Sequence, residues 1–168
     1  PSLPYPCWTR FLFVPLVSWV NADDVLDVGD ARFNAVFKIV EVPQTSPGPL
    51  GHSRLLSAKF AADAQIGAGT VLDPTSVQGI AEAGGRLIVM PHAGDDVVRA
   101  AKSRDLAAVP GFATPTEAFA MIEAGADGLK LFPAEASGPP VLKAMRAVLP
   151  KDVPVLPVGG ISPKKMAG

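Results

Sequence analysis

The sequence has few of the residues that build disulfides and metal clusters. Its 168 residues include one cysteine, Cys7, and two histidines, which leaves no internal disulfide and no cysteine cluster for zinc or iron–sulfur. A single cysteine fits a reducing compartment, and we expect Cys7 to be an inert thiol. The net charge is −1, so composition gives no indication of a polyanionic partner such as nucleic acid.

Long uninterrupted hydrophobic runs are also missing. The apolar stretch over residues 8–20 contains Arg10 and Pro15 and is too short to cross a bilayer. It lacks the basic start and the small-residue cleavage site of a signal peptide. We therefore predict a cytoplasmic protein without a membrane partner, in which this stretch includes a buried strand. Because the sequence begins with Pro1 and not methionine, we expect further residues upstream.

The composition is typical of one globular domain. Hydrophobic residues make up 48% of the chain and charged residues 18%, which excludes a disordered chain. A chain of this length can bury a sizeable core.

From about residue 36 onward, one pattern repeats along the chain. A short apolar run is followed by an end rich in glycine, proline or reactive side chains, and then by an amphipathic helix. The repeat of about 20–25 residues is typical of a βα unit. The predicted strands are 37–42, 64–67, 87–90, 106–109, 128–132 and 153–158. Because βα barrels carry their active sites at the carboxyl ends of the strands, we expect the reactive side chains there.

Helix boundaries are marked by capping residues. Thr114 begins a capping box, with proline at the first helical position and Glu117 at the third. Asp73-Pro74 and Ser162-Pro163 repeat the signal of a capping residue followed by proline. These signals predict three helix starts.

The predicted elements amount to seven strands and six helices, counting a strand near residues 12–17 and a helix over 23–32. A seventh helix would begin at Ser162. A closed barrel needs one more βα unit, roughly 30–45 residues at this repeat length. We predict an α/β fold, a (β/α)8 TIM barrel whose last βα unit lies beyond Gly168, with residues 1–168 forming a single domain. The alternative is a sheet that does not close.

Lys130 is the most reactive candidate in the sequence. Strand alternation places Leu129 and Leu131 on one face and Lys130 on the other. If both faces are interior, desolvation lowers the pKa of Lys130 and leaves an amine that can attack a carbonyl near neutral pH. The alternative is a lysine that reaches solvent from the edge of a strand.

Five motifs stand in the order and at the spacing of a known family. They are Glu41-Val42-Pro43, Ile66-Gly67-Ala68-Gly69-Thr70-Val71-Leu72, Pro110-Gly111-Phe112-Ala113-Thr114-Pro115-Thr116-Glu117, Leu129-Lys130-Leu131-Phe132-Pro133 and Pro157-Val158-Gly159-Gly160-Ile161. Together they resemble the class I 2-keto-3-deoxy-6-phosphogluconate and 2-keto-3-deoxy-6-phosphogalactonate aldolases (KDPG and KDPGal aldolases). The resemblance runs from about Phe37 to Gly168, and residues 1–20 match the family poorly.

The resemblance implies a lyase of carbohydrate metabolism that cleaves a phosphorylated keto acid to pyruvate and glyceraldehyde 3-phosphate. Lys130 would form a Schiff base with the C2 ketone, and the protonated imine would accept the electrons of the breaking bond. Glu41 would transfer protons, through a water molecule. No metal or other cofactor is implied. The alternative for Glu41 is a surface carboxylate.

The same resemblance implies how the substrate is bound. Thr70 would contact the pyruvate part, while Pro91, Phe132 and Pro133 would line the pocket. Gly159 and Gly160 would offer backbone N–H groups to the phosphate. Each has a structural alternative: Thr70 as a turn cap, the apolar residues as core, and the glycines as an ordinary turn. We expect both histidines, His52 and His92, to lie in solvated loops.

The sequence also departs from the family. The substrate-binding arginine of the first strand would fall near Ser18-Trp19, and neither Arg10 nor Arg32 fits its motif. The segment 43–47 lacks the arginine of gluconate-type members, which favours a galactonate-type substrate.

The resemblance further implies a homotrimer. Apolar side chains near the N-terminus, such as Phe11, Phe13 and Trp19, could then be buried between subunits. Two alternatives to an active aldolase remain: a degenerate, non-catalytic barrel that binds phosphate, and another phosphate-binding barrel such as an isomerase or synthase.

Overall fold

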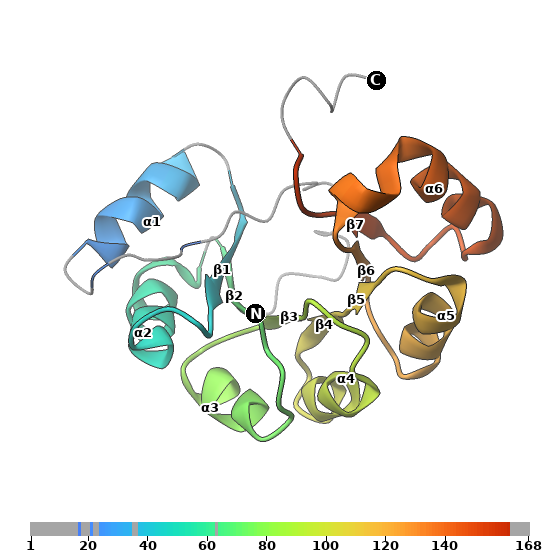
Figure 1. Ribbon diagram of the computed structural model, residues 1–168. Coiled ribbons are helices and arrows are strands. Elements are labelled where there is room, and N and C mark those ends of the chain that lie inside the picture. The colour runs from blue at the N-terminus through green and yellow to red at the C-terminus, as the bar shows by residue number, and fades with distance from the viewer. Residues whose placement is uncertain (1–16, 18–20, 22–23, 35–36, 63, 162–168) are drawn as a thin grey trace.

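Helices and parallel strands alternate along the chain in the computed structural model, which describes residues 17, 21, 24–34, 37–62 and 64–161 (Figure 1). In order, the elements are α1 (Val25–Asn34), β1 (Ile39–Pro43), α2 (Pro49–Phe60), β2 (Gln65–Gly69), α3 (Ser76–Glu82), β3 (Leu87–Val89), α4 (Asp95–Lys102), β4 (Ala107–Val109), β5 (Gly111–Phe112), α5 (Pro115–Glu123), β6 (Leu129–Leu131), α6 (Ala134–Val148) and β7 (Val155–Pro157). The predictions for Cys7, for residues 8–16, for Ser18-Trp19 and for Ser162-Pro163 fall outside the described residues.

The strands lie inside and the helices outside, in an arc that follows chain order (Figure 1). Neighbouring strands are parallel throughout, in the orders β1-β2-β3-β4 and β5-β6-β7. This is the arrangement that repeated βα units produce, because each helix returns the chain to the same end of the sheet. The predicted α/β class with a parallel sheet is confirmed. None of the described helices is long and apolar enough to cross a membrane.

A closed barrel is not seen among the described strands, which form two sheets of four and three strands. The break lies at Pro110, between β4 and β5, because proline has no N–H to donate to the ladder. Backbone bonds still cross it: Asp127 N–H, just before β6, donates to the Ala108 carbonyl of β4 at 2.9 Å, and Gly111 N–H of β5 donates to the His92 carbonyl, after β3, at 3.1 Å. The two sheets are therefore joined through the β4–β5 segment.

Of the strand predicted near residues 12–17, the structure describes residue 17. Val17 N–H donates a hydrogen bond to the Glu41 carbonyl at 2.9 Å, so residue 17 lies beside β1. The other residues of that prediction, 12–16, lie outside the described part of the chain.

Side-chain alternation divides the core into two layers. One face of the strands packs against the helices, as Val40 and Val42 do on β1 and as Leu129 and Leu131 do on β6. The other face forms a separate inner cluster, whose buried members are Ile39, Leu87, Val89 and Val109. Glu41 and Lys130 alternate onto this inner face, so both faces of β6 are interior, as the catalytic interpretation of Lys130 requires.

Of the predicted helix starts, the one at Thr114 is confirmed and the one at Asp73 is displaced. The capping box is present: Thr114 Oγ1 accepts from Glu117 N–H at 3.3 Å, and Glu117 Oε2 accepts from Thr114 N–H at 2.8 Å. The Asp73-Pro74 signal was wrong by two residues, since α3 follows Thr75. Asp73 Oδ1 instead accepts Thr75 N–H at 2.8 Å, so its side chain stabilises a turn before the helix.

The prediction for His52 was wrong. His52 lies in α2 and its side chain is 4% exposed. Gly48 adopts φ +56° and Pro49 begins α2 immediately after it, so the helix includes His52. His92 is exposed, as predicted.

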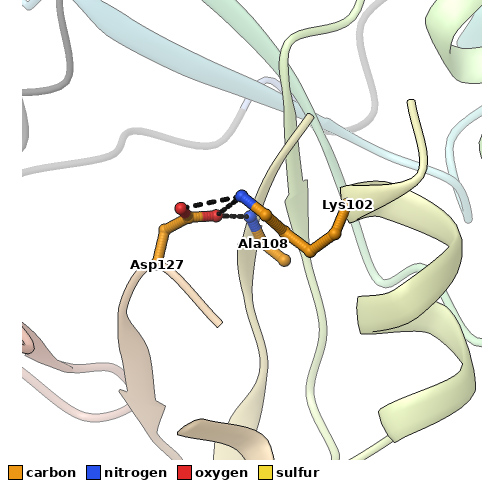
Figure 2. A network of polar contacts seen from close by, with 3 residues as sticks. All are labelled: Lys102, Ala108 and Asp127. Carbon is orange, nitrogen blue, oxygen red and sulfur yellow. Dashed lines mark hydrogen bonds and ion pairs between the residues drawn. The ribbon is translucent and has the colours of Figure 1, made fainter. Parts of the chain in front are cut away.

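Asp127 connects α4, β4 and the segment before β6 (Figure 2). Its carboxylate, on a side chain that is 8% exposed, accepts Lys102 Nζ and Ala108 N–H at 2.8 Å. Replacing Asp127 with alanine removes the acceptor of a buried N–H, so we expect the free energy of unfolding to fall by about 1–3 kcal/mol. Asp127→Asn keeps an acceptor for Ala108 N–H, so its free energy of unfolding, measured by urea titration, should fall less than that of Asp127→Ala. If the two variants lose the same amount, the effect comes from the contact with Lys102 and not from the Ala108 hydrogen bond.

Candidate active site

Glu41 on β1 and Lys130 on β6 are the two buried ionisable side chains of the inner face. Their exposed fractions are 4% and 8%. Glu41 pairs with Gly67 in the β1–β2 ladder, and Lys130 lies between Gly111 and Leu156 on its neighbouring strands. The β1 and β6 strands approach the same interior from different sheets, and the two charges interact there.

Burial sets the protonation of both groups. Desolvation raises the pKa of Glu41 from 4.5 to about 7, against the opposing effect of the positive charge of Lys130. Desolvation also lowers the pKa of Lys130, against the opposing effect of the Glu41 carboxylate. Near pH 7, Glu41 can therefore both give and take a proton, and more of the Lys130 amine is neutral than in an exposed lysine. This is the pairing that a nucleophilic amine and its proton carrier need.

Gly69 provides the space that the Glu41 carboxylate occupies. A Cβ atom on Gly69 would overlap Glu41 Oε2. Within the described structure, Glu41 Oε2 is buried and has no hydrogen-bond partner. A buried carboxylate oxygen without a partner is costly, and a bound water or substrate can satisfy it. The sequence motif contained Gly69, but this role depends on the pairing of β1 with β2 and was not predicted.

Thr70 follows β2 directly, at the carboxyl end where the site was predicted. Its φ is +56°, an unusual value for a β-branched residue. Such conformations cost about 1–3 kcal/mol and cluster at ligand-binding positions. The strain is consistent with a binding role for Thr70, which stays a prediction.

The strained backbone at Thr70 can be tested by stability. Glycine adopts positive φ without penalty, whereas alanine does not, so we expect Thr70→Gly to unfold with a free energy about 1–2 kcal/mol higher than Thr70→Ala. Both variants lack the hydroxyl, so the difference between their free energies of unfolding reports the cost of the left-handed backbone conformation. Urea denaturation of the two proteins measures it, and identical midpoints would show that the left-handed conformation is not maintained.

Phe132 lies near Lys130, and Pro91 lies against a strand neighbour of Lys130. The Phe132 ring centroid is 5.0 Å from Lys130 Nζ, close enough for a cation–π contact, and the side chain is 36% exposed. Pro91 follows β3 and packs against Gly111, where a Cβ atom would overlap the Pro91 carbonyl group. Gly111 is the strand neighbour of Lys130. The described structure therefore brings Phe132 to the amine and Pro91 to the neighbouring strand, and their role as a pocket wall stays a prediction.

Gly159 and Gly160 follow β7, with φ of +102° and +62°. Side chains rarely adopt these values, so the two glycines allow a backbone turn that presents no side chain of its own. Ala134 N–H donates to the Val158 carbonyl at 2.8 Å, which ties this turn to the start of α6. The turn therefore lies next to the segment that carries Phe132, beyond the carboxyl end of β6.

A parallel βα fold with a buried amine of lowered pKa and a buried carboxyl of raised pKa is the arrangement that Schiff-base chemistry on a carbonyl compound needs. Within the described parts of the chain, no three histidine, cysteine, aspartate or glutamate side chains are grouped as metal ligands.

Comparison with known proteins identifies the family. The chain belongs to the KDPG and KHG aldolase family, whose match spans residues 8–168 and so extends over most of the N-terminal segment that the motifs had left out. It is 39% identical to the 2-dehydro-3-deoxy-6-phosphogalactonate aldolase of Escherichia coli K12, over 95% of this chain and 78% of that protein. Members of the family are lyases.

Two solved structures extend this comparison. A native KDPGal structure superposes with a TM-score of 0.90 at 40% identity, over 92% of this chain and 75% of that one. The KDPG aldolase of Legionella pneumophila, crystallised with pyruvate captured as a covalent carbinolamine intermediate, gives a TM-score of 0.89 at 29% identity, over 99% and 80% of the two chains. The architecture described above is therefore that of the aldolases.

Proposed function

We propose that this protein is a class I aldolase that cleaves a 2-keto-3-deoxy-6-phospho sugar acid to pyruvate and glyceraldehyde 3-phosphate. The observation that carries the proposal is the pair formed by Lys130 and Glu41, buried on the inner face with pKa values shifted toward neutrality. The family membership and the covalent pyruvate adduct of the Legionella relative support it.

The reaction follows from this pair. The Lys130 amine attacks the C2 ketone and gives a carbinolamine, which loses water to form a protonated imine. The C4 hydroxyl then loses its proton, the C3–C4 bond breaks, and its electrons pass into the imine to give an enamine and the free aldehyde. Protonation at C3 and hydrolysis release pyruvate and restore the amine. Glu41 carries the protons, through a water held at its unpartnered oxygen.

The remaining site residues bind the substrate in this proposal. Thr70 hydrogen-bonds the pyruvate part, and Pro91 and Phe132 keep water from the imine. Gly159 and Gly160 bind the phosphate through their backbone, because an anion can approach glycine closely. The left-handed turn at these glycines and the 5.0 Å contact of Phe132 with Lys130 support the assignments.

We favour the 6-phosphogalactonate-type substrate over the 6-phosphogluconate type. The segment 43–47, which follows β1, has no arginine. Identity is also higher to the relative named as a phosphogalactonate aldolase, at 39%, than to the KDPG aldolase of Legionella, at 29%.

We propose that the intact protein forms a single-domain, closed (β/α)8 barrel, which needs one further βα unit after β7. We also propose that it associates as a cytoplasmic homotrimer. Sedimentation of the intact protein tests the trimer.

Steady-state cleavage of both substrates tests the function. Pyruvate release is followed with lactate dehydrogenase and NADH, and the phosphogalactonate compound should give the higher kcat/KM. Faster cleavage of the phosphogluconate compound would reverse the substrate assignment. A folded chain that releases pyruvate from neither compound would favour the degenerate, non-catalytic barrel.

A further inference from the structure

The side chain of Glu135 lies against Gly160. A Cβ atom on Gly160 would overlap Glu135 Oε2 and would lie 2.6 Å from Glu135 Cβ and 2.9 Å from Glu135 Cδ. At Gly159, by contrast, the nearest atoms to such a Cβ are 3.5 Å away, an ordinary contact distance. Within the described structure, what crowds Gly160 is therefore the side chain of one acidic residue.

The backbone fixes Glu135 at this position. Glu135 is the second residue of α6, and the residue before it, Ala134, donates its N–H to the Val158 carbonyl at 2.8 Å. This bond holds the start of α6 beside the turn after β7. Glu135 is exposed, so its side chain can turn away from the glycines without losing a buried position.

The contact places the negative Glu135 carboxylate at the turn where, in the proposed function, the negatively charged substrate phosphate binds. A phosphate that approaches the backbone of Gly159 and Gly160 must come within a few ångströms of the Glu135 carboxylate. Like charges at such distances repel, and the repulsion is greatest for a phosphate dianion. Substrate binding therefore requires that the carboxylate leave Gly160, or it proceeds with reduced affinity.

We propose that Glu135 competes with the substrate phosphate for the Gly159–Gly160 turn and so sets the affinity of this subsite. This inference rests on the proposed function, which places the phosphate at that turn. Glu135 lowers the affinity for the phosphorylated substrate and for the phosphorylated aldehyde product alike. It leaves the chemistry at Lys130 unchanged, because the pyruvate part of the substrate, which is bonded to Lys130, carries no phosphate.

Replacement of Glu135 by glutamine tests the competition, because glutamine keeps the shape and removes the charge. Inorganic phosphate should bind Glu135→Gln about 5- to 10-fold more tightly by calorimetry, as expected for removal of one nearby like charge. KM for the phosphorylated substrate should fall by a similar factor, with kcat within about twofold. The control is Glu123→Gln, at an exposed glutamate that ends α5, which should change neither quantity.

Unchanged or weaker phosphate binding in Glu135→Gln would overturn the proposal and leave Glu135 as a packing residue of the turn. Glu135→Ala provides a second variant, with the same expected direction. The proposed function is checked separately, by trapping pyruvate on Lys130 with borohydride, which Glu135→Gln should not alter. If borohydride traps no pyruvate on Lys130 of the unmutated protein, the proposed aldolase function is contradicted. Whether Glu135 competes with phosphate is decided separately, by the phosphate-binding measurement.

Discussion

Replacement of Lys130 by methionine is expected to lower kcat by at least about 10⁴-fold, because the reaction proceeds through a bond to this amine and no other group can supply it. Methionine fills a similar volume in the inner core without a charge to desolvate, so the fold should persist. The pKa of Glu41 should rise above about 7, because the positive charge of Lys130 lowers it in the parent protein. Steady-state kinetics and carboxyl-carbon NMR measure the two effects.

The matched control for Lys130→Met is Lys143→Met, at an exposed lysine on α6. It changes the net charge by the same amount and should retain full activity. Residual activity of a tenth or more in Lys130→Met, with a folded protein, would contradict the role of Lys130 as the nucleophile.

Replacement of Glu41 by glutamine is expected to lower kcat by about 10²–10⁴-fold and to stabilise the protein at alkaline pH. Glutamine cannot carry protons, which accounts for the loss of activity. The gain in stability follows from the pKa of Glu41, which is about 7 in the folded state and 4.5 ordinarily. A raised pKa means that the favourable contribution is present below pH 4.5 and is lost as the pH rises through 7.

At pH 8 the parent protein therefore carries the cost of a buried carboxylate, about 3 kcal/mol, which Glu41→Gln removes. At pH 4 the two proteins should unfold with nearly equal free energies. Urea titrations at both pH values measure the difference, with Glu123→Gln as the control at an exposed site. A stabilisation that is the same at pH 4 and pH 8 would show that packing, and not ionisation, is responsible.

The position of Lys130 was predictable because it depends on a local rule. Strand alternation places it opposite Leu129 and Leu131, and the apolar residues on both sides in the sequence indicate a strand buried on both faces. The capping box at Thr114 was predictable for the same reason, since its two partners lie three residues apart.

The contacts that refine the site were not predictable, because they join residues far apart in sequence. Gly69 makes room for Glu41 only through the β1–β2 register, which pairs Gly69 with Pro43. The approach of Glu135 to Gly160 likewise depends on how α6 begins beside the turn after β7. Sequence motifs marked both glycines without indicating what each one accommodates.

Two local predictions were wrong. His52 was assigned to a solvated loop, but Pro49 begins a helix that buries it. Asp73 was assigned as a helix cap, but its side chain stabilises a turn, and α3 follows Thr75.

The central claim is that Lys130 forms an imine with a keto acid. The most direct measurement is incubation of the protein with pyruvate and borohydride, followed by intact mass spectrometry and peptide mapping. Borohydride reduces an imine to a stable amine, so we predict one pyruvate-derived adduct per chain, located on Lys130. A folded protein that gains no adduct, or gains it on another lysine, would contradict the assignment of this site as that of a Schiff-base aldolase.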